Sequence, residues 1–521
     1  MSSGTPSRPR LRRWLPTMVA AAALVGGSAL VSATPAAADD AAPLGPIVSK
    51  TGLPPTGYEV TIRYKNDGAS RVQIAPEMTF SDPALITSGT AAETKPGSQW
   101  EPGDVPGIKL SGEGAGWTVY EMTKDADGIW TYRSPLPSGT FNYAFVVNCA
   151  SDAGTGCPRI PDPANPVWNP DDVGGPNRQV YVPSDRSYGT LDKYVEAPVS
   201  DAGDRGTFQH YSYPSTSTAG TQGLSVYTPP GYNKNRSTPY PTIYLSHGAG
   251  GDEYDWSNSG VAGNILDNAI AEGRMQPSVV VMTNFNGIPG GTAGYATEIT
   301  TKVIPYVQKN LNVSKRASDR AFAGLSAGGG RANYLLFNTT DQFAYYGLWS
   351  AAAGTYVAPT EAQLAAMKKV EVVHIGTGLQ DWLANINLSS LQREAGLKAA
   401  GVNVVAFNQP GIHSWDIWRM ELNDFLRRVA FKATTTNLTV AQKNNGKVKI
   451  TAKVAADAKT STVSPTGRVE FLVDGRVVGA PQELTGKSVS ITVTAQPGQQ
   501  VTVRYSGNAL FNGSSRTVTV D

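Results

Sequence analysis

Four short apolar runs, separated by helix-length stretches, constrain the fold of this chain most strongly. They are YPTIYLSH, SVVVMTNF, RAFAGLS and KVEVVHIG, and each is followed by a glycine-rich or polar turn. Buried parallel strands have this continuous apolar character, and a long crossover must connect each pair of them. The pattern therefore predicts an α/β domain over residues 205–432. Ligands of such a sheet bind at the carboxyl ends of its strands.

The regions on either side of this domain show a different pattern of apolar and polar residues. Short alternating runs separated by Gly, Pro and Asp turns predict an antiparallel β-sandwich over residues 57–195. Residues 434–521 look similar, because GKVKITAKVAA alternates and Asp474-Gly475 separates two strand-like runs as in a hairpin. We expect residues 39–56 to be a linker. The segment LRRVAFKATTTNLTV predicts the end of the last α/β helix, followed by a threonine-rich connector.

The first 38 residues have the plan of a secretory signal peptide. An arginine-rich head precedes an apolar stretch from about residue 19 to residue 31, and Ala-Ala-Ala ends at Ala38. The alternative is a retained membrane anchor, but the apolar stretch is shorter than the roughly 20 residues that a span requires. No later segment is apolar enough to cross a bilayer. The pair Arg12-Arg13 leaves both the general and the twin-arginine export routes open.

Composition limits the partners. The net charge of the 521-residue chain is +2 and charged residues make up 17%, so no basic excess predicts nucleic-acid binding. The two cysteines, Cys149 and Cys157, lie close together in NCASDAGTGCP. An exported chain meets an oxidising compartment, so we expect them to form a disulfide. Metal binding is the poorer alternative because no histidine lies nearby.

Ser326 occupies a motif that predicts nucleophilic chemistry. The segment GLSAG is Gly-x-Ser-x-Gly, in which a serine sits on a sharp turn from a strand to a helix. Side chains at Gly324 and Gly328 would collide with the neighbouring backbone of such a turn. Gly329 and Gly330 would then let the following helix pack closely against the sheet.

A serine nucleophile needs a base, and the chain has four histidines: His210, His247, His374 and His413. In α/β-hydrolase chains the catalytic histidine comes after the serine in the sequence, which leaves His374 and His413 as candidates. His374 lies within an apolar run, where a buried, hydrogen-bonded histidine is expected. His413 lies in a loop between a strand and an amphipathic helix, so we predict that it is the base.

The third member of a triad is an acid that orients the imidazole. Asp341 and Asp381 are the aspartates between the serine and His413. Asp341 is expected to cap the end of the helix after the serine. Glu371 lies at the start of its strand, at the opposite edge of the sheet from the serine. Asp381 follows the strand VEVVHIG at the expected carboxyl end, so it is the predicted acid.

An oxyanion requires two preorganised N–H donors. One should be Ala327, which begins the helix after the serine. The other is expected from Ala249 or Gly250 in SHGAGGDEYDW, where His247 would position the turn. The alternative for this stretch is an ordinary flexible loop.

Tryptophans lie near each predicted catalytic residue. Trp256 follows the glycine-rich turn, Trp382 follows Asp381, and Trp415 and Trp418 follow His413. Trp256, Trp382 and Trp415 are therefore predicted to bind substrate at the rim of a cleft, where they would favour short or aromatic acyl groups over long alkyl chains. The alternative for Trp415 and Trp418 is that they pack the last helix.

Three segments carry a family resemblance. LSVYTPPGYNKNRSTPYPTIYLSHGAGGDEYDW, RAFAGLSAGGGRA and PGIHSWDIWRMEL resemble the feruloyl and acetylxylan esterases of the first carbohydrate-esterase family, within the esterase-D-like α/β-hydrolases. The likeness covers roughly 220 residues, and it implies the same triad of Ser326, Asp381 and His413. The sequence departs from the family in one place, because GTGLQD carries extra residues where Gly-Thr-x-Asp is usual.

The flanking regions carry resemblances of their own. Residues 57–183 are similar to the early-set Ig-like domains that precede many such esterases, and residues 434–521 look like bacterial Ig-like repeats of surface proteins. These resemblances leave contact with carbohydrate or the cell wall open, and for the last domain a spacer or wall-associating module is the preferred interpretation. Aromatic faces of Trp100, Trp117 and Trp130 could form a sugar platform, but a place in the core is the favoured alternative.

These observations together predict a secreted, multidomain serine carboxylesterase, with a central α/β-hydrolase domain between two all-β Ig-like sandwiches. The resemblance implies feruloyl or acetyl esters of plant cell-wall polysaccharide as substrates, and no metal or organic cofactor. An acyltransferase, a siderophore esterase or a polyester depolymerase would use the same triad. An inactive hydrolase-like surface binding protein is the alternative from a different class.

Overall fold

The computed structural model describes residues 43–87, 94–107, 118–168, 175 and 177–521. The predicted signal peptide, the first part of the predicted linker and Trp117 lie outside these residues. Residues 43–521 form one compact unit. Within the described part of the chain, no helix has the length and apolar character needed to cross a membrane.

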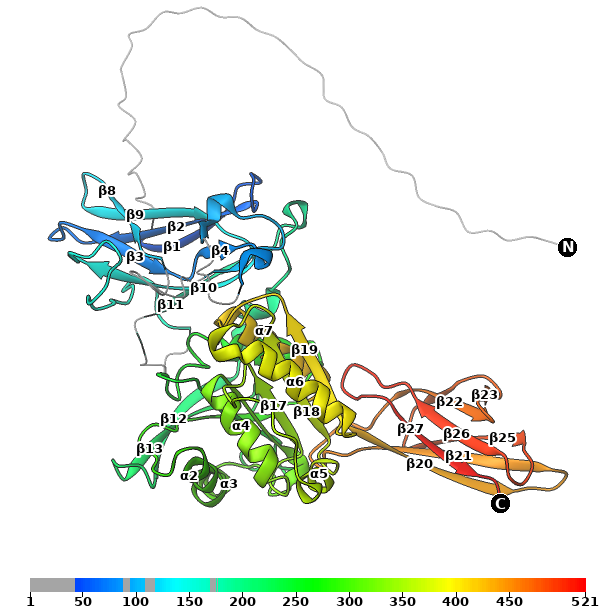
Figure 1. Ribbon diagram of the computed structural model, residues 1–521. Helices are drawn as coiled ribbons and strands as arrows, with labels where there is room; N and C mark the ends of the chain where they lie inside the picture. Colours follow the sequence, from blue (N-terminus) through cyan, green and yellow to red (C-terminus); the bar gives the residue numbers. More distant parts are fainter. Residues whose placement is uncertain (1–42, 88–93, 108–117, 169–174, 176) are drawn as a thin grey trace, which may run out of the picture. The chain divides into compact units, whose positions relative to one another are not determined.

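An eight-stranded sheet organises the α/β domain (Figure 1). Its strands, in spatial order, are β12 (Thr207–Pro214), β13 (Thr221–Thr228), β15 (Val279–Thr283), β14 (Thr242–Ser246), β16 (Arg320–Leu325), β17 (Tyr345–Trp349), β18 (Val372–Gly378) and β19 (Val404–Gln409). The six strands β14 to β19 run parallel to one another, whereas β12 and β13 form an antiparallel edge of the sheet. The four apolar runs are β14, β15, β16 and β18, so the predicted parallel sheet is confirmed.

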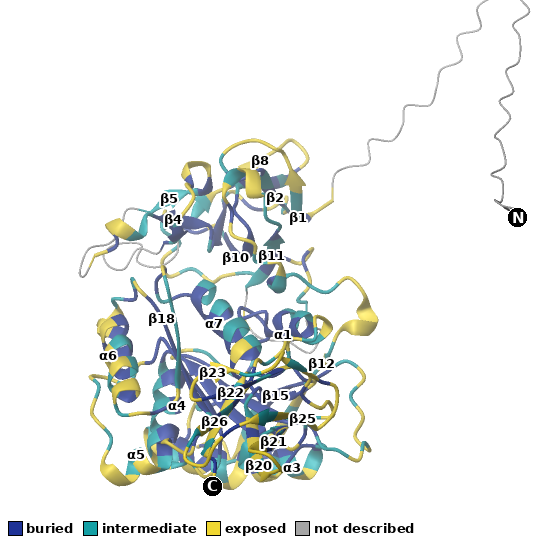
Figure 2. Ribbon diagram, turned by 90° about the vertical axis from the view of Figure 1, so that its right-hand side faces the viewer, coloured by how far each residue is buried: buried dark blue, intermediate teal, exposed yellow. Residues whose placement is uncertain are grey.

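Helices cover both faces of this sheet, because successive residues of a buried strand point to opposite faces. Ile243 and Leu245 pack with α1 (Ala262–Ala271) and α7 (Trp415–Arg428). Tyr244 belongs to the opposite core, which is closed by α2 (Gly291–Glu298), the π-helical turn η6 (Ile299–Val303), α3 (Ile304–Asn310), α4 (Ala327–Asn338), α5 (Glu361–Met367) and α6 (Ile386–Ala399). Figure 2 shows buried strands beneath helices whose outer faces are exposed.

Short 3₁₀ turns complete the connections between the larger elements. They are η1 (Pro83–Leu85), η2 (Gly97–Gln99), η3 (Arg186–Tyr188), η4 (Tyr194–Glu196), η5 (Ala202–Asp204), η7 (Ala317–Asp319) and η8 (Leu383–Asn385). In η1, η3 and η5 an aspartate caps the turn by accepting a backbone N–H, as short polar side chains do at such positions.

The N-terminal region is an antiparallel sandwich of two four-stranded sheets. One holds β1 (Gly45–Lys50), β2 (Tyr58–Lys65), β9 (Ile129–Pro135) and β8 (Thr123–Lys124); the other holds β11 (Arg178–Val182), β10 (Gly139–Val147), β3 (Val72–Pro76) and β7 (Tyr120–Glu121). A small third sheet comprises β5 (Lys95–Pro96), β4 (Thr79–Ser81) and β6 (Val105–Pro106). Trp100 and Trp130 are buried in the core between the sheets, so they form no exposed sugar platform.

The predicted linker over residues 39–56 requires a correction. Strand β1 lies inside it and pairs with β2 from Gly45↔Arg63 to Lys50↔Tyr58. The segment GPIVSK carries no clear alternation, and Pro46 weakens its strand signal, although an edge strand tolerates proline. The sandwich therefore starts well before residue 57.

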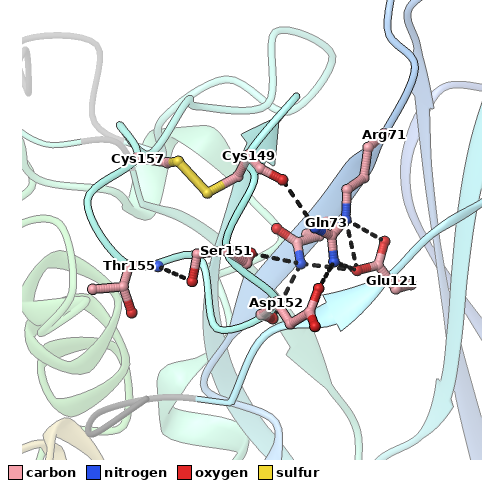
Figure 3. A network of polar contacts seen from close by, with 8 residues as sticks. All are labelled: Arg71, Gln73, Glu121, Cys149, Ser151, Asp152, Thr155 and Cys157. Carbon is pink, nitrogen blue, oxygen red and sulfur yellow. Dashed lines mark hydrogen bonds and ion pairs between the residues drawn. A yellow bond between two sulfur atoms is a disulfide. The ribbon is translucent and has the colours of Figure 1, made fainter. Parts of the chain in front are cut away.

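The disulfide between Cys149 and Cys157 is confirmed, with Cα atoms 5.9 Å apart. Beside it, Arg71 donates to the Cys149 carbonyl at 2.9 Å and pairs with Glu121 and Asp152 (Figure 3). The disulfide loop is thus attached to the sheet at β3 and β7, which indicates a structural role.

The C-terminal region also contains two antiparallel sheets. One comprises β20 (Thr434–Gln442), β21 (Lys447–Ala456) and β25 (Ser488–Thr494); the other comprises β23 (Arg476–Val477), β22 (Gly467–Val473), β26 (Gln500–Tyr505) and β27 (Ser514–Thr519), with β24 (Gln482–Leu484) beside β22. Asp474 and Gly475 form the predicted two-residue turn, both with positive φ, between paired residues Val473 and Arg476.

The threonine-rich connector is a second correction. Residues 434–442 form β20, which pairs with β21 along its length. The loop after β21 contacts the α/β domain, since Lys459 N–H donates to Asp319 Oδ1 at 2.7 Å and Ala458 is buried in the core around α1 and α7. The predicted connector is therefore a paired strand, and this junction packs against the α/β domain.

Candidate active site

Ser326 lies on a strained turn between β16 and α4. Its φ and ψ are 52° and −118°, in a region that non-glycine residues rarely adopt. The Ser326 N–H donates to the Trp349 carbonyl at 2.9 Å, while its own carbonyl accepts from Gly330 and Ala352. These bonds to α4 and to the end of β17 hold the serine in the unfavourable conformation.

The surrounding glycines are required by close backbone approaches. A Cβ atom at Gly324 would lie 2.6 Å from the Gly328 carbonyl carbon, and one at Gly328 would lie 2.5 Å from the His247 carbonyl oxygen. Gly329 and Gly330 similarly face the backbone after β17, so α4 packs closely against that segment. The glycines let the nucleophile helix begin directly beside the end of β14.

Asp381 and His413 form the hydrogen bond expected of an acid and a base. Asp381 Oδ2 lies 2.7 Å from His413 Nδ1, and the aspartate is fully buried whereas the histidine is partly accessible. Asp381 follows β18 and His413 follows β19. Ser326 ends the parallel strand β16, so all three residues lie at the carboxyl edge of one sheet.

The loops that carry Asp381 and His413 are joined by hydrogen bonds. Gln380 N–H donates to the Gly411 carbonyl at 2.9 Å, and Gly411 N–H donates to Gln380 Oε1 at 2.9 Å. A Cβ at Gly378 would lie 2.5 Å from the same Gly411 carbonyl. The extra residues of GTGLQD therefore pair the Asp381 turn with the His413 loop.

The other histidines near the sheet are engaged elsewhere. His374 is buried between Trp349 Nε1, at 2.8 Å from its Nδ1, and Asp424 Oδ2, at 2.9 Å from its Nε2. His247 Nδ1 lies 2.7 Å from the Gly248 carbonyl, and burial lowers the pKa of His247 to about 4. His247 is therefore neutral at neutral pH and fixes the turn after β14.

The turn after β14 borders Ser326. A Cβ at Gly248 would lie 3.5 Å from Ser326 Cβ, and Ala249 and Gly250 follow as exposed residues. Ala327 is the first residue of α4, where N–H groups have no acceptor within the helix and the helix dipole favours negative charge. The amides predicted for an oxyanion hole thus lie on the two segments that flank Ser326.

The tryptophan predictions are corrected in part. Trp256 is 1% exposed and its indole N–H donates to the Ser246 carbonyl at 3.1 Å, so it packs the core and does not line a cleft. Trp382 donates to the Ile86 carbonyl at 3.0 Å and packs against residues of the N-terminal sandwich. Trp415 is half-buried between Trp256 and Trp418, and the Trp418 ring meets His413 edge-on at 4.9 Å.

Glu421 was not identified from the sequence as a residue of this site. It lies on the buried face of α7, fully enclosed, and neither of its carboxyl oxygens has a hydrogen-bond partner among the described residues. Burial, followed by the negative charges of Asp381 and Asp424, raises the pKa of Glu421 well above its usual value. An acidic residue at an apolar position of an amphipathic helix was the available signal.

A cleft of about 600 Å³ starts at Ala327, the residue after Ser326. Its walls are α4, the loop over residues 352–358 and Arg393 of α6. The aromatic side chains of Tyr334, Phe337 and Tyr356 lie in these walls, and no motif in the sequence indicated them.

Residues 215–429, which span most of the α/β domain, match the family described as Putative esterase. By this match, the α/β domain is similar to the members of that family. A relative of this chain, "Endo-1,4-beta-xylanase/feruloyl esterase" from Xylanibacter ruminicola, is 30% identical over 334 residues, which cover 60% of this chain and 41% of the relative. "Endo-1,4-beta-xylanase Y" from Acetivibrio thermocellus is 34% identical over 138 residues, covering 24% and 13%. The chain thus spans about two-fifths of the length of the first relative and a smaller share of the second.

Solved structures with similar chains include the feruloyl esterase module from Clostridium thermocellum in complex with sinapinate. It is 25% identical, covers 46% of this chain and 91% of its own, and has a TM-score of 0.39. The enterobactin esterase from Shigella flexneri is 15% identical, with coverages of 74% and 96% and a TM-score of 0.47.

Proposed function

We propose that the protein is a serine carboxylesterase that works through Ser326, His413 and Asp381. The observation that carries the proposal is the 2.7 Å bond between His413 and buried Asp381 at the sheet edge where the strained Ser326 begins α4. Such a turn exposes a serine hydroxyl at the top of the sheet, and the histidine supplies the base that the hydroxyl needs.

The reaction proceeds in two acyl-transfer steps. His413 Nε2 takes the Ser326 hydroxyl proton as Oγ attacks the ester carbonyl, while Nδ1–H stays bonded to Asp381. The N–H groups of Ala327 and of Ala249 or Gly250 stabilise the oxyanion. His413 then protonates the leaving alkoxide, and a water molecule, deprotonated by the same nitrogen, releases the acid from the acyl-enzyme.

The proposed substrates are feruloyl or acetyl esters of plant cell-wall polysaccharide. Support comes from the family, from relatives named for xylanase and feruloyl esterase activity, and from the sequence resemblance. We also propose that residues 1–38 direct export and that the two flanking β-regions are Ig-like modules that contact carbohydrate or the cell wall.

A substrate panel tests this assignment. We expect kcat/KM to be higher for methyl ferulate and acetylated xylan than for a palmitoyl ester, because this ratio reports differential binding of the transition states. A preference for the palmitoyl ester would reject the cell-wall substrates and favour a lipid or polyester. If a catecholate siderophore ester is cleaved faster than methyl ferulate and acetylated xylan, the result would favour a siderophore esterase.

A further inference from the structure

Two arginines in the cleft beside Ser326 carry positive charge without a carboxylate partner among the described residues. Arg331 lies one turn into α4 and Arg393 lies on α6, so each comes from a different wall of the cleft. Neither belongs to the proposed triad or oxyanion hole. Their surroundings indicate what the cleft binds.

Arg331 is held in place by neutral groups. Its guanidinium carbon lies 3.4 Å from the centroid of the Phe285 ring, and Nη1 donates to the Ala327 carbonyl at 3.0 Å. Nε is buried and has no hydrogen-bond partner among the residues that the structure describes. Burial lowers the pKa of Arg331, and Tyr295 is the one ionisable neighbour that opposes this effect.

Arg393 is more deeply enclosed, at 2% exposure. It donates from Nη1 to the Ser389 carbonyl at 3.3 Å and from Nη2 to the Gly354 carbonyl at 3.1 Å, while Nε has no partner. Burial lowers the pKa of Arg393 as well, and the opposing neighbour is Tyr356, again not a carboxylate.

Burying an arginine without a counter-charge costs free energy, and a guanidinium in such a site is suited to a carboxylate. Asn333 Oδ1, also in the cleft wall, is buried without a donor and could accept a hydroxyl. The half-buried rings of Tyr334 and Tyr356 suit the apolar face of a sugar. A carboxylate, hydroxyls and an apolar ring face occur together in a uronic acid.

We propose that this cleft is a subsite for a uronic acid residue, so that the preferred ester substrates are acidic polysaccharides. The inference rests on the proposed esterase function, because it makes the cleft the place where the sugar next to the ester binds. The proposed triad does not distinguish charged from neutral substrates, whereas this subsite would favour a negatively charged sugar.

Binding to a Ser326→Ala variant tests the subsite without catalysis. We expect glucuronic-acid-substituted xylotriose to bind at least tenfold more tightly than xylotriose, since a hydrogen bond to a charged group contributes about this much. The preference should shrink in Arg331→Gln and Arg393→Gln backgrounds and as salt concentration rises. The exposed Arg476→Gln is the matched control and should preserve it.

Equal affinity for the two oligosaccharides, or a preference that neither arginine variant nor salt reduces, would overturn the proposal. If Arg393→Gln fails to fold, Arg393→Lys, Arg331→Gln and the salt series on the unaltered cleft still decide it. Free succinate binding better than free glucuronate would reject a sugar and point to an acyl group with its own carboxylate. Hydrolysis of 4-nitrophenyl acetate by the wild-type chain separately tests whether the protein is an esterase at all.

Discussion

Replacing Glu421 by glutamine tests whether a neutral carboxylic acid lies behind the proposed triad. The carboxyl group is fully buried without a hydrogen-bond partner among the described residues, and Asp381 and Asp424 add unfavourable negative charge. Because the pKa of Glu421 is raised in the folded protein, there is a pH range above about 4.5 in which the folded protein keeps the proton and the unfolded chain has lost it. The stability contribution of this group is therefore present below that pH and is lost as pH rises toward the folded-state pKa.

The size of this pH dependence follows from the binding of one proton by Glu421. Each pH unit in that range lowers the free energy of unfolding of the wild-type protein by about 1.4 kcal/mol, and Glu421→Gln lacks this loss. For a domain of roughly 150–250 residues, about 1 kcal/mol corresponds to about 2–4 °C in Tm. The Tm of the variant minus that of the wild type should therefore grow by about 3–5 °C for each pH unit between about pH 5.5 and the pKa of Glu421 in the folded protein.

Thermal unfolding followed by tryptophan fluorescence at several pH values measures this difference. Glu361→Gln, an exposed change on α5, is the control for effects common to any such substitution. A Tm difference that stays constant with pH would show that Glu421 is ionised in the folded protein and would refute the reasoning. The acidic limb of the kcat/KM profile should also stay in place, because a neutral carboxyl puts no charge near His413; a limb shifted to lower pH would contradict us.

Three further predictions concern the triad, the nucleophile turn and the disulfide. Asp381→Asn should lower kcat by about 10⁴, as loss of the orienting acid does in other triads, whereas Asp341→Asn on the surface should be mild; the reverse outcome would assign the acid to Asp341. Gly328→Ala should abolish most activity or folding, since its Cβ meets the His247 carbonyl, and Gly486→Ala, with open space around it, should be tolerated. Equal tolerance in an activity assay would show that the turn is not as tight as described. Replacing Cys149 and Cys157 by serine should destabilise the N-terminal sandwich by about 2.5 kcal/mol from lost loop-closure entropy, measured by urea unfolding, and an unchanged midpoint would argue against a stabilising role.

The sequence predicts the parallel sheet well because its strands are buried on both faces and read as continuous apolar runs. It fails at β1 and β20. GPIVSK has no alternation, and TTTNLTVAQ resembles a polar connector although threonine favours strands. Both are edge elements whose pairing partners, β2 and β21, decide their conformation.

Chain order and strand ends are sufficient to place Ser326, Asp381 and His413 at one edge of the sheet, and to predict the pairing of Asp381 with His413. They cannot reveal the paired bonds between Gln380 and Gly411, because these depend on two loops meeting in space. Proximity along the chain also misplaced Trp256, since a residue near a catalytic turn can point into the core. Arg393 gave no signal in the sequence, because its burial depends on packing against the loop at Gly354.

The most direct test of the central claim is covalent labelling of the folded protein by a fluorophosphonate, with the modified peptide identified by mass spectrometry. We predict stoichiometric labelling on Ser326, no labelling of Ser326→Ala, and labelling of His413→Ala slowed by at least about 10³, since the base activates the nucleophile. Failure of the folded wild-type protein to react, or reaction at a different residue, would contradict the assignment of Ser326 as the nucleophile of an esterase.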